Sequence, residues 1–345
     1  MQRRRVSPLM GLLGAAFLAL LVVPPPLGAS VSGPGREPSA VGYGGGVVST
    51  DDEATRTAQA VLADGGGSVD AALAAAAVLA VRSPAAGGLG GGSAVLHVDG
   101  ADGSIRMVDG CSPAGAYAAW ALAARTWGSL PLETLLADAR TLAHGALGRT
   151  VRDLQAGRPT ALAAAEPARP VVRTLTARAE GAFRVAGGVV GTRGHVAADA
   201  YVSVLVADRR GDVTAVVSSM GRRGGSGEAL GGSGLVLGSA LPGACGDALP
   251  SVVLRSAAAP QPASVELAVA ATTGRKPVPG GVDALAGQRE VLRDRVLRGA
   301  PLDAVLRAQP AAVLAVELDP DGQVHAAADG RRGGSAAVVH GSGTP

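Results

Sequence analysis

Two cysteines and five histidines are the side chains of this 345-residue chain whose types best suit nucleophilic or metal chemistry. Neither set has the short spacings of a metal site, and no histidine is close to the first cysteine in the sequence to activate its thiol. We therefore predict no metal and no cofactor. Whether the two cysteines form a disulfide or remain free thiols stays open. The residues are Cys111 and Cys245, and His97, His144, His195, His325 and His340.

A glycine-rich run, Gly87-Gly-Leu-Gly-Gly-Gly92, is the part of the sequence that most invites comparison with a phosphate-binding loop. It lacks the Gly-Lys-Ser/Thr ending and leads into an apolar strand rather than a helix. We therefore interpret these glycines as positions where backbone packs closely against backbone.

The first 29 residues have the three-part pattern of a secretory signal: a basic start, an apolar run from Leu9 to Val23 and a small-residue exit near Ala29. An uncleaved anchor is the alternative, although the run is short for a membrane span. Removing this segment removes three of the 31 basic residues and no acid, which leaves 28 basic and 28 acidic residues. We expect a secreted, extracellular protein with no nucleic-acid partner and no membrane contact after signal removal.

The clearest structural signal is a hairpin at 199–220. Two apolar, β-branched runs, 201–207 and 213–217, flank the polar segment Asp-Arg-Arg-Gly-Asp. Because both runs are apolar on both faces, we expect the hairpin inside a covered sheet. Helices are predicted at 54–63, 69–81, 114–127, 132–143, 284–297 and 302–308. Further strands are predicted at 94–98, 105–109, 250–254, 265–271, 312–318 and 323–327. Residues 148–195 are predicted to be irregular or to form short helices.

The order of these elements resembles the γ-glutamyltranspeptidase family. The resemblance is carried by Ala60-Val-Leu-Ala-Asp-Gly-Gly-Gly-Ser-Val-Asp-Ala, by Ser83-Pro84 with the glycine run that follows, by the hairpin, and by 291–310. It covers most of 45–318, with a shortened middle. It implies an α+β fold, the four-layer αββα sandwich of N-terminal-nucleophile hydrolases. It also implies one domain over 46–330, divided into 46–198 (large-subunit-like) and 199–330 (small-subunit-like), after a flexible linker at 30–45 and before a disordered tail at 331–345.

In that family the precursor cleaves itself before a threonine, whose own amine then serves as the base. Counting back from the hairpin turn puts Tyr201 at this nucleophile position, and a phenol on a rigid ring cannot make the compact N-to-O acyl shift. Ser203, on the same strand face, is a substitute that would need a two-residue register change. Cys111 stands where the family has its carboxylate-binding arginine. The family's serine pair is replaced by Gly246-Asp247, and only its oxyanion-type glycine pair survives, as Gly280 and Gly281.

These replacements predict a secreted γ-glutamyltranspeptidase-like protein that has lost catalysis, with a small γ-glutamyl-like molecule as its expected ligand. The alternative is an active γ-glutamyl hydrolase or transferase that acts on glutathione or γ-glutamyl amides through a non-standard nucleophile such as Ser203. A relic without a selected function is a third reading. The sequence assigns no oligomeric state.

Overall fold

The structure is a computed structural model that describes residues 30–31, 38–180, 183–187, 200–239, 249–255, 264–273, 284–309, 312–329 and 333–340. Several predictions fall outside these residues. They concern the signal segment 1–29, His195, Cys245, Gly246-Asp247, Gly280 and Gly281.

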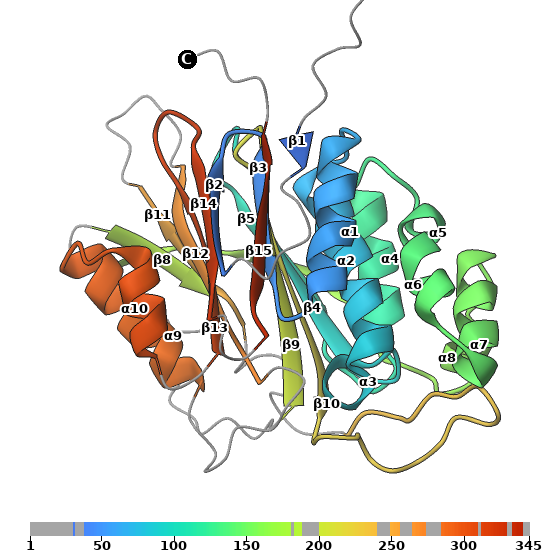
Figure 1. The fold of residues 1–345 in the computed structure, drawn as a ribbon. Helices are drawn as coiled ribbons and strands as arrows, with labels where there is room; N and C mark the ends of the chain where they lie inside the picture. The colour runs from blue at the N-terminus through green and yellow to red at the C-terminus, as the bar shows by residue number, and fades with distance from the viewer. Residues whose placement is uncertain are drawn as a thin grey trace, which may run out of the picture.

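Two antiparallel sheets face each other between two layers of helices (Figure 1). In spatial order, the first sheet contains β1 (Ser30–Val31), β15 (Ser335–His340), β3 (Gly45–Ser49), β9 (Ala200–Asp208), β10 (Val213–Gly221), β4 (Gly92–Val98), β5 (Ile105–Gly110) and β6 (Val171–Leu175). The second contains β2 (Ser39–Gly42), β14 (Val324–Ala328), β13 (Ala312–Leu318), β12 (Val265–Thr272), β11 (Ser251–Leu254), β8 (Phe183–Gly187) and β7 (Arg178–Glu180).

The helices form the two outer layers (Figure 1). The first sheet is covered by α1 (Asp52–Ala63), α2 (Ser68–Arg82), α3 (Pro84–Gly87), α4 (Ala116–Trp127), α5 (Leu132–Leu135), α6 (Ala137–Leu142), α7 (Gly145–Gln155) and α8 (Thr160–Ala163). The second is covered by α9 (Ala284–Leu292), which a π-helical turn at Arg293–Leu297 continues, and by α10 (Leu302–Ala308). This is the predicted α+β, αββα sandwich.

Alternation along the strands builds a separate core in each space between layers. In β4, Val95 belongs to the core under the helices, whereas Leu96 belongs to the core between the two sheets. Successive strand residues point to opposite faces, so one strand serves both cores. A third core joins the second sheet to α9 and α10 through Val269, Val291 and Leu306.

The predicted hairpin is confirmed as the centre of the first sheet. β9 and β10 are buried along their whole lengths, and each is one to four residues longer than the predicted run. Their register pairs Tyr201 with Ser219 at one end and Ala207 with Val213 at the other. Gly211 has φ +80 in the connecting turn, a conformation that glycine adopts without strain.

The glycine run before β4 is confirmed as a place of close backbone approach. A side chain at Gly90 would collide with the Val236 carbonyl, and one at Gly91 would collide with the Ser219 carbonyl. The run therefore lets the segment before β4 lie directly against the glycine-rich loop after β10.

Two segments assigned to a linker and a tail contain sheet strands. Within 30–45, β2 pairs with β14, and Ala40 lies opposite Ala326. Within 331–345, β15 lies between β1 and β3. Both strands consist mostly of Ser, Ala, Gly and Val in short runs. Such residues give a weak strand signal, so their state is set by pairing with neighbours.

The predicted helix at 132–143 is divided at Leu136, and Leu132 and Leu135 of the first piece and Ala139 of the second are buried in the helical core. The prediction of irregular or short helical structure at 148–195 is confirmed for the helices α7 and α8 and is wrong for the strands that follow them. Helix α7 occupies Gly145–Gln155 and buries Val151 and Leu154. Strands β6, β7 and β8 follow, and the exposed side chains of β6 show no apolar alternation from which a strand could be predicted.

Helix α2 is buried over almost its entire length, as its apolar sequence predicts. Its Asp70 carboxylate accepts hydrogen bonds from the backbone N–H groups of Gly67, Ser129 and Leu130. Among the described residues, no helix combines the length and the hydrophobicity that a bilayer crossing requires.

Candidate functional site

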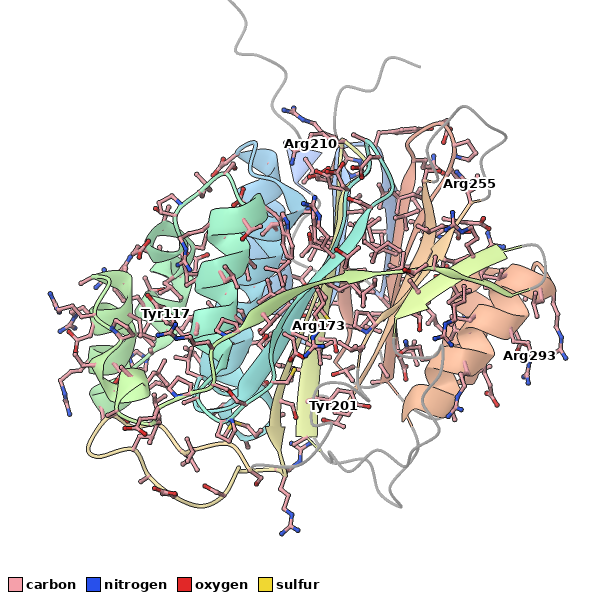
Figure 2. The ribbon with its side chains drawn as sticks, turned by 180° about the vertical axis from the view of Figure 1, so that it is seen from behind. Tyr117, Arg173, Tyr201, Arg210, Arg255 and Arg293 are labelled. Atoms are coloured by element: carbon pink, nitrogen blue, oxygen red, sulfur yellow. The ribbon has the colours of Figure 1, made fainter. Side chains whose placement is uncertain are left out.

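The predicted nucleophile position lies at the start of β9, at the edge where both sheets end (Figure 2). Tyr201 is the second residue of the strand and its side chain is buried, with 2% of the residue exposed. In Figure 2, Tyr201 and Arg210 mark opposite ends of the β9–β10 hairpin. The register also brings the end of β5, next to Cys111, to the Tyr201 end of the sheet.

The Ala200–Tyr201 peptide, which the resemblance predicts as the equivalent of the bond that the family cleaves, is hydrogen-bonded on both sides. The Ser219 hydroxyl donates to the Ala200 carbonyl at 2.8 Å. The Tyr201 N–H donates to Thr273 Oγ1 at 2.9 Å, and the same hydroxyl donates to the Tyr201 carbonyl at 2.8 Å. This peptide is therefore built into the junction of the two sheets.

Thr273 and Ser219 were not singled out from the sequence. Thr273 follows β12 and is 72 residues from Tyr201 in the chain, so only the packing of the second sheet against the first brings them together. The one local signal is the Thr272-Thr273 pair at the end of an apolar strand.

Ser203, the substitute nucleophile, is fully buried between the sheets. Its exposed fraction is 0%, and its hydroxyl donates to the Ala271 carbonyl of β12 at 2.8 Å. A serine held in this way has neither an accessible oxygen nor a base within hydrogen-bonding distance among the contacts that its hydroxyl makes.

Cys111 follows β5 and is disulfide-bonded, so it offers no thiol nucleophile. Its N–H donates to Asp109, and the Asp109 carboxylate is paired with Arg173 on β6 at 3.2 Å. The position at which the resemblance predicts the family's carboxylate-binding arginine therefore holds a covalent cross-link. The Arg173 guanidinium is already paired with the Asp109 carboxylate of the same chain.

The described part of the chain, which excludes His195, has no group of three or more His, Cys, Asp or Glu that could hold a metal. His325 lies on the outer face of the second sheet, 2.9 Å from the Ser39 hydroxyl and 3.4 Å from the Asp303 carboxylate. His97 lies in the first sheet, at the Arg210 end of the hairpin.

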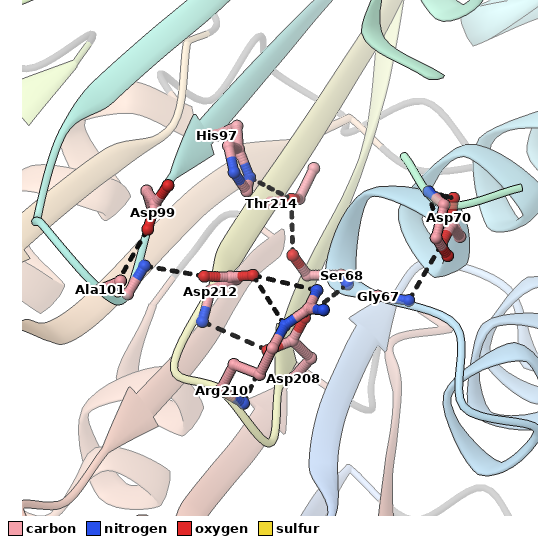
Figure 3. A network of polar contacts seen from close by, with 12 residues as sticks. Gly67, Ser68, Asp70, His97, Asp99, Ala101, Asp208, Arg210, Asp212 and Thr214 are labelled. Carbon is pink, nitrogen blue, oxygen red and sulfur yellow. Dashed lines mark hydrogen bonds and ion pairs between the residues drawn. The ribbon is translucent and has the colours of Figure 1, made fainter. Parts of the chain in front are cut away.

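The Arg210 end holds the titratable groups of the hairpin (Figure 3). The buried Asp208 carboxylate accepts from the Ser68 N–H at 2.9 Å and from Arg210 Nη2 at 3.1 Å. Burial raises the pKa of Asp208, and the bond from Ser68 opposes that shift. The Asp208 charge in turn raises the pKa of Arg210. Burial lowers the pKa of His97, which shares a hydrogen bond of 3.0 Å with Thr214.

Comparison with known proteins gives one family match over part of the sequence, and a separate likeness in fold. Residues 54–118 match the sequence profile of the family described as Gamma-glutamyltranspeptidase. No curated protein matches the sequence. Among solved structures, a cephalosporin acylase from Bacillus halodurans superposes with a TM-score of 0.68 at 14% identity, over 93% of this chain and 100% of that one. The structure of LmbA2991HD superposes with a TM-score of 0.64 at 16% identity, over 87% of this chain and 99% of that one.

Over residues 54–118, the chain is similar to the γ-glutamyltranspeptidase family. The match begins inside α1, contains α2, α3, β4 and β5, and ends before β9. At these identities, the structural likeness establishes the N-terminal-nucleophile hydrolase fold alone. For this γ-glutamyltranspeptidase-like protein, the roles of Tyr201 and its neighbours must therefore be argued from their own geometry.

Proposed function

We propose that this γ-glutamyltranspeptidase-like protein is exported and neither cleaves itself nor transfers γ-glutamyl groups. It would act by binding, with a small γ-glutamyl-like molecule as the expected ligand. The observation that carries the proposal is the state of the Ala200–Tyr201 peptide. Its carbonyl and N–H are bound by Ser219 and Thr273, and the residue after it supplies a buried phenol.

The geometry of the acyl shift explains why this matters. Self-cleavage requires a hydroxyl one carbon from the Cα of the residue after the bond, so that it can attack the preceding carbonyl through a small ring. The tyrosine hydroxyl is at the far side of an aromatic ring and cannot reach its own preceding carbonyl. Without cleavage, position 201 has no free α-amine to act as a base.

The ligand-binding side of the site supports the same conclusion. Arginine binds carboxylates through a planar fork of donors, and a cysteine in a disulfide has no such donors. Position 111 is disulfide-bonded. A γ-glutamyl carboxylate would therefore lack its principal cation there. The basic, apolar and small-residue pattern of 1–29 supports export.

The decisive experiment examines the purified full-length protein from a secreting host by intact mass spectrometry and denaturing electrophoresis, alongside turnover of a chromogenic γ-glutamyl amide. We expect one uncleaved chain after signal removal and no turnover. Two fragments divided between residues 200 and 203, or turnover that is lost in Ser203→Ala, would contradict the proposal and support the active alternative. Tyr201→Phe is the matched control, since it keeps the ring and cannot change either result if Tyr201 is inert.

A further inference from the structure

A polar pocket of about 410 Å³ lies at the Arg210 end of the hairpin, between the β4–β5 turn, the β9–β10 turn and the end of α4. Its volume is within the range of small-molecule sites. The chemistry-bearing residues that line it are His97, Asp99, Arg106, Trp127, Arg210 and Asp212. The lining residue His97 pairs with Thr214 on β10, and Ser219 lies five positions further along that strand, which is roughly 17 Å of extended chain. The pocket is therefore separate from the Tyr201 end.

The lining residues His97 and Arg106 belong to a row of polar residues that the sheet register fixes. Thr214 on β10 lies opposite His97 on β4, and His97 lies opposite Arg106 on β5. Trp127, the last residue of α4, stacks on the His97 ring with centroids 5.3 Å apart, and the Arg106 guanidinium lies 5.6 Å from the centroid of the same indole. The row and the indole form one wall with flat, polarisable surfaces.

The two acids of the pocket already have partners. Asp212 accepts from the Gly100 N–H at 2.8 Å and pairs with Arg210 at 3.1 Å (Figure 3). Asp99 accepts from the Ala101 N–H at 2.9 Å and lies 3.5 Å from Arg106. These carboxylates therefore shape the turns and hold the guanidinium groups, and have little capacity left for a ligand.

Two donors are left over. Arg106 Nε and Trp127 Nε1 are buried and have no hydrogen-bond partner in the described part of the chain. An unpaired buried donor destabilises the fold, and a bound acceptor removes that cost. The lining acids and arginines balance in charge, so the site suits a guest with a single negative charge better than a dianion. A carboxylate has two oxygens in the plane that a guanidinium fork recognises.

We propose that this pocket binds a small planar monocarboxylate, whose carboxylate accepts hydrogen bonds from Arg106 and from the Trp127 N–H. The site does not depend on self-cleavage or on γ-glutamyl chemistry, so it can operate in a protein without a nucleophile.

The test uses benzoate as the probe and benzamide as its neutral match, titrated into the full-length protein with tryptophan fluorescence as the readout. The chain has two tryptophans, and Trp120 is fully buried with its N–H bonded to Ser93, so Trp127 is the reporter. We expect a saturable change with benzoate, none with benzamide, and no change in Trp127→Phe. Arg106→Gln should weaken binding at least about tenfold, which is about 1.4 kcal/mol.

Arg158→Gln is the matched control, because Arg158 is an exposed arginine paired with Asp153 at 2.9 Å outside the pocket. It should bind benzoate as the unaltered protein does. Calorimetry on the unaltered protein repeats the benzoate–benzamide comparison without any variant. The proposal would be overturned if benzamide bound as tightly as benzoate or if no saturable binding were seen. It would also be overturned if Arg106→Gln bound benzoate with unchanged affinity, or if inorganic phosphate bound more tightly than benzoate.

Discussion

The two ends of the β9–β10 hairpin are stabilised in different ways. At the Tyr201 end, a large aromatic side chain is buried and the nearby hydroxyls bond to backbone groups. At the Arg210 end, the buried Asp208 carboxylate joins the turn to the start of α2 and accepts from the Arg210 guanidinium. The resemblance predicts the family's chemistry at the first end, whereas Asp208 and Arg210, whose pKa values are both raised, lie at the second.

On our proposal that Tyr201 occupies the family's nucleophile position, this difference indicates what remains when such a position loses its nucleophile. The sheet register, the close glycine contacts and the cross-sheet bonds of the Tyr201 end depend on backbone geometry, so a change of side chain leaves them intact. The polar end depends on particular carboxylates and guanidinium groups, and each of these can be tested by one substitution.

The largest expected effect is at the Tyr201 end. Tyr201→Ala removes a fully buried ring and should lower the free energy of unfolding by about 3–5 kcal/mol, since the rigid sheets cannot collapse into the cavity. Tyr201→Phe keeps the ring and should cost no more than about 1.5 kcal/mol. Urea denaturation measures both. Equal losses for the two variants would show that the hydroxyl, and not the filling of space, holds this end.

The next largest effect is at the Arg210 end. Asp208→Ala leaves the N–H groups of Ser68 and Arg210 without their acceptor and should cost about 2–3 kcal/mol. Because Arg210 is largely exposed, the cost should shrink in high salt, whereas that of Tyr201→Ala should not. Asp321→Ala, in the exposed β13–β14 turn, is the matched control and should change stability by no more than about 0.5 kcal/mol. If Asp208→Ala lowered the free energy of unfolding as little as Asp321→Ala does, the polar contacts of the Arg210 end would not stabilise the fold, and the contrast between the two ends of the hairpin would be refuted.

The smallest expected effect is a pH dependence from His97. Burial lowers its pKa in the folded protein, so between that value and the unfolded value of about 6.5 the unfolded chain binds more protons. Stability therefore rises with pH through this interval and is lost as the pH falls below about 6.5. His97→Gln should flatten this part of the curve, measured by urea denaturation at a series of pH values. An unchanged slope of stability against pH would show that folding does not shift the pKa of His97.

Much of the fold could be predicted from the sequence, because β-branched runs and buried Ala-rich helices have strong local signals. The hairpin at 199–220 and the αββα class are examples. Strands β2, β15 and β6 could not be predicted, since small or exposed residues form strands there only through their partners. The division of the helix at Leu136 follows from packing in the helical layer.

The candidate sites divide in the same way. Tyr201, Ser203 and Cys111 could be placed by counting along a family pattern. Thr273 and the row of Thr214, His97 and Arg106 could not, because they are brought together by the register of strands that are distant in the sequence. A histidine that looks isolated along the chain can thus be the centre of a polar row.

The interleaving of early and late strands has a consequence for the timing of folding. β3 lies between β15 and β9, and β2 pairs with β14. The sheet pairing of these two early strands is therefore complete only after residues 324–340 have been synthesised. Pairings that are so distant in sequence make folding slow, since loop closure precedes any gain from contacts. A ribosome would release the whole polypeptide before either sheet could be completed. In a chain that is exported, such slow folding keeps the polypeptide unfolded until it has crossed the membrane.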